Sequence, residues 1–498
     1  MNRPTAIYSA AQVRALDAWE IGKRRVPAFT LMTRAAEGAL KVLRGRWPQS
    51  KRVAVVCGAG NNGGDGYVLA RLAQAAGLEA LVLAAAPPDK LGGEARRAQE
   101  EWLAAGGRAH PFVADALSGC DVIVDGLLGT GLKGPPRPDT IAVIRAINAA
   151  RRPVLALDIP SGVDADTGAV HEAAVRAEIT LSFVAFKTGL FLGEGPEHAG
   201  VVLLDDLGVV APAAPQFAPL LRRIDEGELP QVLPRRPREA HKGTNGRVLA
   251  IGGGAGMPGA LRLAGEAALR VGAGLVTVAG HPENLVAVTA TRPELIYLPL
   301  AEEEKRGAGF DDALRASDVF AIGPGLGRGD WAQRLWAQAL RAEGVPAVVD
   351  ADALNLLALN PVKLPADWVI TPHPGEAARL LGSDTREVQA DRLGAVRELR
   401  ARYGAIAVLK GAGSLVASGA GPDIHICERG NPGMATAGMG DVLTGVIAGL
   451  RAQISDSALA ARAGVLVHAL AGDSAAQGGQ RGLVASDVIA ELRGWVNP

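Results

Sequence analysis

The residues best suited to do chemistry lie in a glycine-rich stretch near the end of the chain, residues 431–445. This stretch reads Asn-Pro-Gly-Met-Ala-Thr-Ala-Gly-Met-Gly-Asp-Val-Leu-Thr-Gly, and an apolar segment that could form one helix runs from Val442 to Leu450. Backbone N–H groups at a helix start attract anions, helped by the helix dipole. A carboxylate there, Asp441, could take a proton from a hydroxyl group. Alternatively, Asp441 is only the N-cap of the helix.

A second glycine-rich stretch, residues 58–66, reads Gly-Ala-Gly-Asn-Asn-Gly-Gly-Asp-Gly. It lies between a buried strand expected at 52–57 and a helix expected at 67–76, and this order binds phosphate at the edge of a parallel sheet. The spacing does not match the dinucleotide pattern G-x-G-x-x-G, and a plain tight turn is the alternative. Three side chains here add oxygen atoms to the backbone donors: Asn61, Asn62 and Asp65.

Two further strands of the first half, expected at 121–125 and 154–158, also end in polar residues. Loops after parallel strands lie at one edge of the sheet, so we expect these residues to form one site. Oxygen atoms from Asn, Asp and Ser suit a hard cation rather than zinc. Lys133, in the loop 126–135, offers a positive charge to a phosphate. The converging residues are Asn61, Asn62, Asp65, Asp125, Thr130, Asp158 and Ser161.

The second half alternates strands, glycine loops and helices again, with different loop residues. His373 lies between two prolines after a buried strand, which favours contact with a ligand over a purely structural role. The stretch Lys410–Ser414 follows another strand and suggests a contact to nucleotide phosphate, although it is not a P-loop. We interpret this half as a second domain and not as a repeat of the first.

Composition limits the class of protein. A chain of 498 residues suggests two or three domains. Lys plus Arg and Asp plus Glu each number 52, which gives no electrostatic reason to expect nucleic acid as a partner. No apolar run approaches the ~20 residues that span a bilayer, the three cysteines are far apart, and the N-terminal segment does not resemble a signal peptide. We therefore expect a cytoplasmic protein without a membrane partner.

The 64 glycines and the low aromatic content of 4% are typical of α/β proteins with many tight turns. Proline-rich segments at 210–219 and 233–237 place a domain boundary between 212 and 235. We expect two three-layer αβα domains, residues 1–215 and 225–498.

Several long motifs resemble known families. The second half resembles the ribokinase-like family through Gly438–Asp441, and within it the ADP-dependent NAD(P)H-hydrate dehydratases through three stretches. The first half resembles the NAD(P)H-hydrate epimerases, and the two in this order resemble the bifunctional nicotinamide-nucleotide repair enzymes of bacteria. The matching stretches are 323–327, 371–376 and 431–441 in the second half, and 61–66, 129–135 and 158–162 in the first.

The resemblance implies a Rossmann-like first domain, a ribokinase-like second domain, and two activities. Water can add to the nicotinamide ring of NADH and NADPH, which gives R and S hydrates. The first domain would interconvert these hydrates. The second would transfer a phosphoryl group from ADP to the hydroxyl of the S form, and loss of phosphate would return NAD(P)H, with AMP as by-product. Magnesium is expected with the nucleotide, with Glu376 as a candidate to orient it through water, and we expect a homo-oligomer.

The resemblance also implies roles for individual residues, with Asp441 and Asp158 as the acid/base groups. The potassium ligands would be Asn62, Asp125 and Ser161. The hydrate-binding residues of the epimerase would be Asn61, Asn62, Gly63, Gly64, Asp65, Gly129, Thr130, Gly131, Leu132, Lys133, Gly134, Pro135 and Asp158. The hydrate contacts of the dehydratase would be Ala260, Gly325, His373 and Asp441. The contacts to the AMP moiety would be Lys410, Gly411, Ala412, Gly413, Ser414 and Gly440.

Two rival interpretations stay open on the sequence. The second half could be a kinase of a vitamin precursor such as a hydroxymethylpyrimidine, which would leave a stable phosphorylated product. His373 favours the dehydratase, because related kinases more often have Asn there. The first half could be a non-catalytic binding or scaffolding module, but Asp158 and the intact stretch 61–65 favour an enzyme.

Overall fold

The computed structural model describes residues 5–290, 292–301, 308–419 and 423–498. The chain divides into two compact units. One comprises Ala6–Leu221, and the other comprises Thr5 together with the described part of Arg222–Pro498. The division falls within the interval 212–235 that the proline-rich segments mark.

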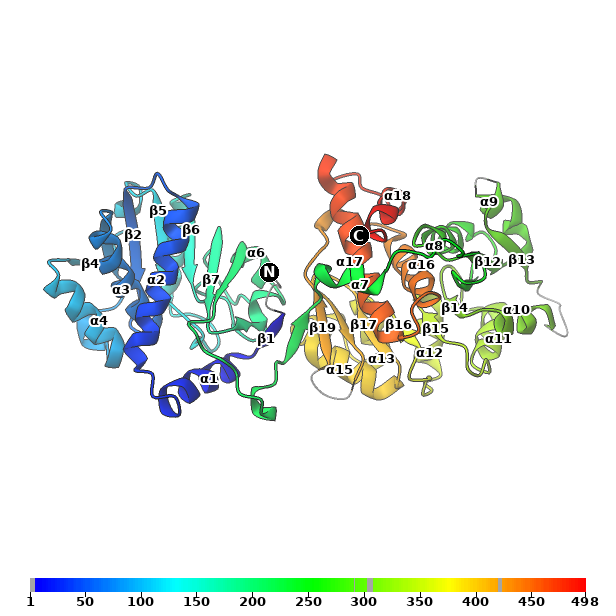
Figure 1. The fold of residues 1–498 in the computed structure, drawn as a ribbon, viewed down its shortest axis with the longest axis horizontal. Coiled ribbons are helices and arrows are strands. Elements are labelled where there is room, and N and C mark those ends of the chain that lie inside the picture. The colour runs from blue at the N-terminus through cyan, green and yellow to red at the C-terminus, as the bar shows by residue number, and fades with distance from the viewer. Residues whose placement is uncertain (1–4, 291, 302–307, 420–422) are drawn as a thin grey trace. The chain divides into compact units, whose positions relative to one another are not determined.

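The first unit is built on a parallel sheet with the strand order β4-β3-β2-β5-β6-β7-β9, and β1 pairs in parallel with β8 (Figure 1). Its strands are β1 (Ala6–Tyr8), β2 (Arg52–Cys57), β3 (Glu79–Ala84), β4 (Ala109–Pro111), β5 (Val122–Gly126), β6 (Val154–Leu157), β7 (Ile179–Phe183), β8 (Phe186–Lys187) and β9 (Val201–Asp205). Its α-helices are α1 (Ala10–Gly22), α2 (Ala28–Arg46), α3 (Asn61–Ala75), α4 (Gly93–Ala104), α5 (Pro138–Ala149) and α6 (Gly195–Ala199).

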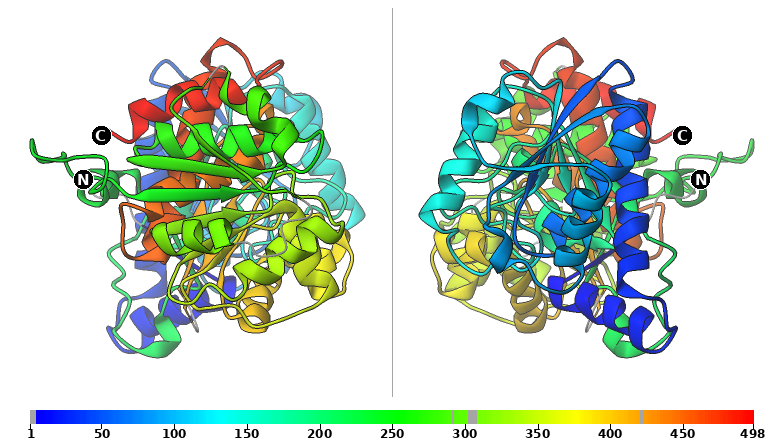
Figure 2. Two further views of the ribbon diagram at one scale, coloured as in Figure 1. Left: turned by 90° about the vertical axis from the view of Figure 1, so that its right-hand side faces the viewer. Right: turned by 90° about the vertical axis from the view of Figure 1, so that its left-hand side faces the viewer.

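Both faces of this sheet are buried. Val53 and Val55 of β2 belong to one apolar cluster, which includes residues of α2, α3 and α4. Ala54 and Val56 belong to another, which includes residues of α5. Successive side chains of a strand point to opposite faces, so a strand without polar alternation requires a helix layer on each side. The right-hand view of Figure 2 shows the strands between these layers.

The second unit has a longer sheet, in the order β13-β12-β11-β14-β15-β16-β17-β18-β19-β10. It is parallel from β13 to β17, and β18 pairs antiparallel with both neighbours. The strands are β10 (Leu221–Arg223), β11 (Arg247–Ile251), β12 (Leu275–Gly280), β13 (Ile296–Pro299), β14 (Val319–Ile322), β15 (Ala347–Val349), β16 (Val369–Ile370), β17 (Ile406–Leu409), β18 (Ser414–Ala417) and β19 (Ile424–Cys427).

The α-helices of this unit lie on both faces of its sheet, as the left-hand view of Figure 2 shows. One face packs on α8, α16, α17 and α18 through an apolar cluster that includes Val248 and Ala250, whereas Leu249 and Ile251 are buried on the other. The helices are α7 (Leu229–Val232), α8 (Pro258–Arg270), α9 (Leu285–Thr289), α10 (Ala308–Ala316), α11 (Asp330–Ala339), α12 (Ala351–Leu359), α13 (Pro374–Leu381), α14 (Thr385–Ala390), α15 (Arg392–Tyr403), α16 (Met439–Arg451), α17 (Ser457–Ala475) and α18 (Ala485–Trp495).

The structure confirms the predicted α/β class with two αβα units, but two helices begin earlier than expected. Helix α3 begins at Asn61 and not at residue 67, and α16 begins at Met439 and not at Val442. The glycines of α3 serve packing: a Cβ on Gly63 would lie 2.1 Å from the carbonyl oxygen of Gly58. The glycines of this stretch therefore allow the backbone of α3 to pack closely, and they do not delay the start of the helix. In the described part of the chain, no helix is both long and apolar enough to cross a membrane.

Candidate active sites

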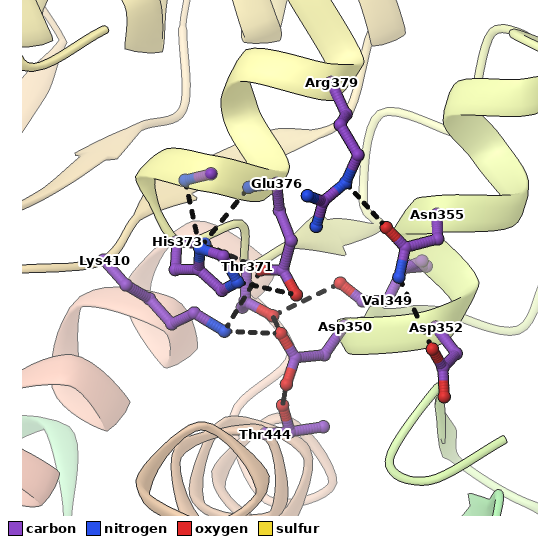
Figure 3. A network of polar contacts seen from close by, with 11 residues as sticks. Val349, Asp350, Asp352, Asn355, Thr371, His373, Glu376, Arg379, Lys410 and Thr444 are labelled. Atoms are coloured by element: carbon purple, nitrogen blue, oxygen red, sulfur yellow. Dashed lines mark hydrogen bonds and ion pairs between the residues drawn. The ribbon is translucent and has the colours of Figure 1, made fainter. Parts of the chain in front are cut away.

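In the second unit, the buried carboxylate of Asp350 accepts hydrogen bonds from polar groups of three other parts of the fold (Figure 3). Asp350 follows β15, and its Oδ1 accepts hydrogen bonds from Lys410 Nζ at 2.7 Å and from Thr371 Oγ1 at 2.8 Å. Its Oδ2 accepts a hydrogen bond from Thr444 Oγ1 of α16 at 2.8 Å. The ends of β15, β16 and β17 thus meet the start of α16, as expected for loops at the carboxyl edge of a parallel sheet.

Lys410 brings a positive charge to the first turn of α16. Burial alone would lower the pKa of its ammonium group, but the carboxylates of Asp350 and Glu376 outweigh this effect and raise it. A Cβ on Gly440 would lie 3.2 Å from Lys410 Nζ. The predicted AMP contacts Lys410 and Gly440 are therefore neighbours, next to helix N–H groups that can bind an anion.

Asp441 is not the N-cap of α16, so that alternative is wrong. The N-cap is Gly438, with φ +87°, and Asp441 is the third residue of the helix. Burial raises the pKa of Asp441 from its ordinary value of 3.8 to about 7, and the negative charge of Asp350 adds to this effect. A carboxyl group with a pKa near neutrality is suited to accept a proton at physiological pH.

His373 caps helix α13. Its Nδ1 accepts hydrogen bonds from the backbone N–H groups of Gly375 at 3.0 Å and Glu376 at 3.4 Å. In return, Glu376 Oε2 accepts a hydrogen bond from the backbone N–H of His373 at 2.8 Å, which completes a capping box. Burial and the nearby charge of Lys410 lower the pKa of the imidazole. The ring therefore has a structural role at Nδ1, and about half of the side chain remains exposed for a ligand.

The other two predicted hydrate contacts, Ala260 and Gly325, lie beside each other. Gly325 has φ +57°, and a Cβ on it would lie 3.2 Å from the Cβ of Ala260. In the same loop, a Cβ on Gly323 would overlap the backbone oxygen of Asp350 at 1.7 Å. This loop therefore connects the pair to the Asp350 cluster.

The predicted nucleotide loop, residues 410–414, is held by a residue that sequence analysis missed. Arg392 of α15 is buried, and its Nη2 donates hydrogen bonds to the carbonyl groups of Leu409 and Lys410 at 3.3 Å and of Gly413 at 3.2 Å. The hydroxyl of Ser414 donates a hydrogen bond to the carbonyl of Gly411 at 3.0 Å. The exposed members of this loop are Gly411 and Ala412.

In the first unit, the structure brings the three predicted potassium ligands together. The hydroxyl of Ser161 donates a hydrogen bond to Asp125 Oδ1 at 2.6 Å. Asn62 Nδ2 donates to the carbonyl of Leu128 at 2.7 Å, and the same carbonyl lies 3.2 Å from Ser161 Oγ. Asn62 Oδ1 is buried and has no hydrogen-bond partner. Because buried polar atoms are usually paired, this oxygen atom is suited to bind a cation. Burial raises the pKa of Asp125 to about 6. These oxygen atoms fit a hard, weakly charged cation.

Asp158 has its own partner, which sequence analysis also missed. Lys187 of β8 is completely buried, and its ammonium group contacts Asp158 Oδ1 and donates to the carbonyl of Phe183 at 2.6 Å. Two further carboxyl groups are close: burial raises the pKa of Asp17 to about 6 and that of Asp65 well above its usual range, and the charge of Asp158 adds to both shifts. Asp158 has φ +68°, an uncommon conformation for a residue other than glycine.

The remaining hydrate-binding residues of the epimerase prediction fall into two groups. Gly63, Gly64 and Gly129 are packed closely: a Cβ on Gly64 would lie 2.6 Å from Met32 Cε, and one on Gly129 would lie 3.3 Å from the Cβ of Asn62. The loop after Gly129 is more open. The backbone carbonyl of Thr130 in this loop accepts a hydrogen bond from Arg14 Nη1 at 3.2 Å. Its exposed or half-exposed residues are Thr130, Gly131, Leu132, Lys133, Gly134 and Pro135.

Asp350 was visible as a polar residue at a strand end, like those singled out in the first half. Lys187 and Arg392 had no local signal, because a lysine in a strand or an arginine in a helix is usually a surface residue. Their roles depend on partners 29 and 18 residues away, respectively.

Comparisons with known proteins match each of the two units to a known family. Residues 248–493 match a family model described as NAD(P)H-hydrate dehydratase, and residues 28–189 match one described as YjeF-related protein N-terminus. The chain is 44% identical over 495 residues to the bifunctional NAD(P)H-hydrate repair enzyme Nnr of Coxiella burnetii, covering 99% of this chain and 100% of the relative. It is 43% identical to the enzyme of that name from Escherichia coli K12, and this match covers 99% of this chain and 95% of the relative.

Solved structures confirm the ribokinase-like fold. A ribokinase-like superfamily protein of Enterococcus faecalis V583 is 29% identical, with a TM-score of 0.52, and the match covers 56% of this chain and 96% of that protein. A hypothetical protein of Streptococcus mutans, SMU.573, is 31% identical, with a TM-score of 0.51 and coverages of 55% and 98%. Together with the full-length relatives, these matches confirm the resemblance seen in the sequence. The chain belongs to the family of bifunctional NAD(P)H-hydrate repair enzymes.

Proposed function

We propose that the chain repairs hydrated nicotinamide nucleotides. The first unit epimerises the R and S hydrates of NADH and NADPH, and the second dehydrates the S form at the expense of ADP, giving NAD(P)H, AMP and phosphate. The observation that carries this proposal is Asp441, a base with a pKa of about 7 at the N-terminus of α16, next to Gly440 and Lys410. The names of the full-length relatives support it over the kinase alternative.

In the dehydratase site, Asp441 accepts the proton of the substrate hydroxyl as that oxygen attacks the terminal phosphorus of ADP. The bond from that phosphorus to the bridging oxygen breaks, and AMP leaves. Lys410 and the N–H groups at the start of α16 stabilise the negative charge on the transferring group. The carbon–oxygen bond of the phosphorylated hydrate then breaks, phosphate departs with the former hydroxyl oxygen, and loss of a ring proton restores the reduced nicotinamide. His373 and the pair Ala260 and Gly325 hold the hydrate, and residues 410–414 hold the AMP moiety.

Magnesium would accompany the nucleotide and neutralise phosphate charge. Within the described residues, no group of three or more His, Cys, Asp or Glu side chains could hold a metal ion. Mg²⁺ that accompanies a nucleotide is usually held by one or two carboxylates together with phosphate oxygens and water. Glu376 Oε2 accepts a hydrogen bond from the backbone N–H of His373. We propose that Glu376 also orients the magnesium ion through a bound water molecule.

In the epimerase site, Asp158 moves the proton, and the hydrate lies against the segments 61–65 and 129–135. Asn62, Asp125 and Ser161 would hold a potassium ion, which supplies a fixed positive charge beside the phosphates of the substrate. The unpartnered oxygen of Asn62 supports this assignment.

The proposal also includes a cytoplasmic location and a homo-oligomeric state. The latter can be measured by light scattering after size exclusion.

The decisive experiment supplies the purified chain with a mixture of R- and S-hydrated NADPH and follows recovery of absorbance at the reduced-nicotinamide band. With ADP present, recovery should reach completion and release one phosphate per NADPH. Separate reactions with ATP or without nucleotide test the choice of phosphoryl donor. Accumulation of a stable phosphorylated substrate would favour a kinase and contradict the proposal.

A further inference from the structure

Asp350 is buried to 99%, and none of the steps above uses it. It occupies the N-cap position of α12, where an aspartate usually accepts a hydrogen bond from the first turn of its own helix. The side chain of Asp350 makes no such capping bond. It turns instead toward Lys410, Thr371 and Thr444 (Figure 3).

The partners of Asp350 are arranged to stabilise a negative charge. Thr371 and Thr444 are fully buried and each donates a hydroxyl hydrogen bond, while Lys410 adds a charged donor. A buried carboxylate is tolerated only with such compensation.

This carboxylate lies against the first turn of α16, where Asp441 is located. A Cβ on Gly440 would lie 3.6 Å from Asp350 Oδ2, and Thr444, which donates to the same oxygen, is three residues after Asp441. Asp350 thus contacts the helix one turn beyond Asp441 and lies close to the residue before it.

We propose that Asp350 is a positioning residue of the dehydratase site: its buried charge fixes the ammonium of Lys410 beside Gly440 and keeps Asp441 able to act as a base. This inference rests on the proposed function of the second unit. Without Asp350, the ammonium of Lys410 would be free to pair with the carboxylate of Asp441, which would hold that carboxylate in a weakly basic state.

The charges around Asp441 agree with this role. After burial, the carboxylate of Asp350 is the strongest influence that raises the pKa of Asp441, and Asp352 of α12 and Glu376 of α13 act in the same direction. Lys410 acts in the opposite direction and more weakly than Asp350. Removal of the charge of Asp350 should therefore lower the pKa of Asp441.

The test compares the pH dependence of kcat/KM for ADP-dependent dehydration in the full chain and in Asp350→Asn. The midpoint of the acidic limb should fall by about one pH unit, and KM for ADP should rise several-fold because Lys410 is no longer fixed. Thr444→Val is the matched control: it removes one hydrogen bond to Asp350 but keeps the charge, so the midpoint should not move. A uniform loss of rate with an unchanged midpoint in Asp350→Asn would overturn the proposal.

A second measurement does not depend on activity. In the ligand-free full chain labelled with ¹³C-aspartate, the Cγ signal that disappears in Asp441→Asn reports the titration of Asp441. Its midpoint should also be lower in Asp350→Asn. If the wild-type chain does not dehydrate the hydrate, the proposed function fails, whereas this titration still decides the influence of Asp350.

Asp350→Asn removes the nearer of the two carboxylates that pair with the Lys410 ammonium, at 2.7 Å, and leaves only Glu376 at 3.7 Å, so this variant could fail to fold. The double variant Asp350→Asn/Lys410→Met removes both buried charges and leaves neither unpaired. Its Asp441 midpoint should also fall, because Asp350 acts on Asp441 more strongly than Lys410 does. A midpoint equal to or above that of the wild type would overturn the proposal.

Discussion

At the scale of single residues, the two candidate acid/base groups are prepared in different ways. Burial and neighbouring carboxylates raise the pKa of Asp441 to about 7. Asp158 instead contacts the buried ammonium of Lys187 and accepts the backbone N–H of Phe183 at 3.1 Å. A group that receives a proton near neutral pH benefits from a raised pKa, whereas a fixed ammonium beside a carboxylate holds that carboxylate in one orientation.

Asp441→Asn should abolish dehydration and leave epimerisation intact. A positioned base contributes roughly 10²–10⁴-fold to rate, and Asn keeps the shape but cannot accept the proton. Single-turnover recovery of NADPH from the S hydrate measures this loss. Turnover above about a tenth of normal would mean a loss smaller than the low end of that range. This result would contradict the assignment of Asp441 as the base.

The same variant should be no less stable than the wild type at pH 8. Because the folded-state pKa of Asp441 is raised from 3.8 to about 7, the folded protein binds this proton more tightly than the unfolded chain. The contribution of Asp441 to stability therefore falls as pH rises from about 4 to 7 and is absent in Asp441→Asn. Thermal unfolding at pH 5.5 and pH 8 measures the difference.

At the scale of elements, the starts of helices position both sites. Helix α16 presents N–H groups next to Lys410, α13 is capped by His373, and α3 begins at Asn61, so that Asn62 and Asp65 lie in its first turns. Helices α3 and α13 follow the parallel strands β2 and β16, and α16 follows β19. Side chains near a helix start are more rigid than those in a free loop, which suits ligands that must be bound in one orientation.

His373 allows its structural and ligand roles to be separated. His373→Ala should lower the free energy of unfolding by about 1 kcal/mol, because the cap of α13 is lost. His373→Asn should keep most of that stability, because Asn is a good N-cap, but should raise KM for the hydrate. Chemical denaturation and steady-state kinetics measure the two effects. An unchanged KM in His373→Asn would reduce His373 to a capping residue.

The potassium assignment predicts that epimerisation depends on a monovalent cation. Replacement of potassium by tetramethylammonium should slow epimerisation and lower the melting temperature of the first unit, because Asn62 Oδ1 then has no partner. Asn62→Ala is the matched control, since its rate and melting temperature should no longer respond to the swap. A wild-type chain that does not respond to the swap would rule out the site.

At the scale of the whole molecule, the two sites belong to units with separate apolar clusters. The structure refines the place to divide them. Strand β10 pairs with β19 through Arg222 and His425, and Arg429 forms an ion pair with Glu226 at 2.9 Å. A chain that begins at residue 225, the predicted start of the second domain, would lose the pairing of β10 with β19, whereas one that begins at 222 keeps both interactions.

We predict that the activities separate at this boundary. A chain of residues 1–221 should epimerise the hydrate, and a chain of 222–498 should dehydrate only the S form, because domains with their own cores can fold alone. In the full chain, Asp158→Asn should halt repair of a mixed R and S sample once the S form is consumed, apart from slow spontaneous epimerisation. Assays with the separated isomers measure each step. If the 222–498 chain consumed both isomers at equal rates, the first unit would have no catalytic role.

The sequence by itself determined the α/β class, the strands expected at 52–57, 121–125 and 154–158 to within one residue at each end, and the convergence of their polar ends. The reason is local: runs of apolar residues between glycine-rich turns have few alternatives to a buried parallel strand. Adjacent parallel strands such as β2, β5 and β6 must then release their loops at the same edge. The motif stretches were also sufficient to identify the family.

Only the tertiary structure decided which neighbours act on these residues. Lys187 beside Asp158 and Asp350 beside Lys410 come from segments 29 and 60 residues apart. Glycines at the starts of α3 and α16 likewise pack closely against distant segments, Gly64 against Met32 and Gly438 against Leu263, and no local pattern reports this. A local pattern reports the preference of its own segment, but burial and charge at a site depend on every segment that packs there, so the pKa of Asp441 could be known only from the folded chain.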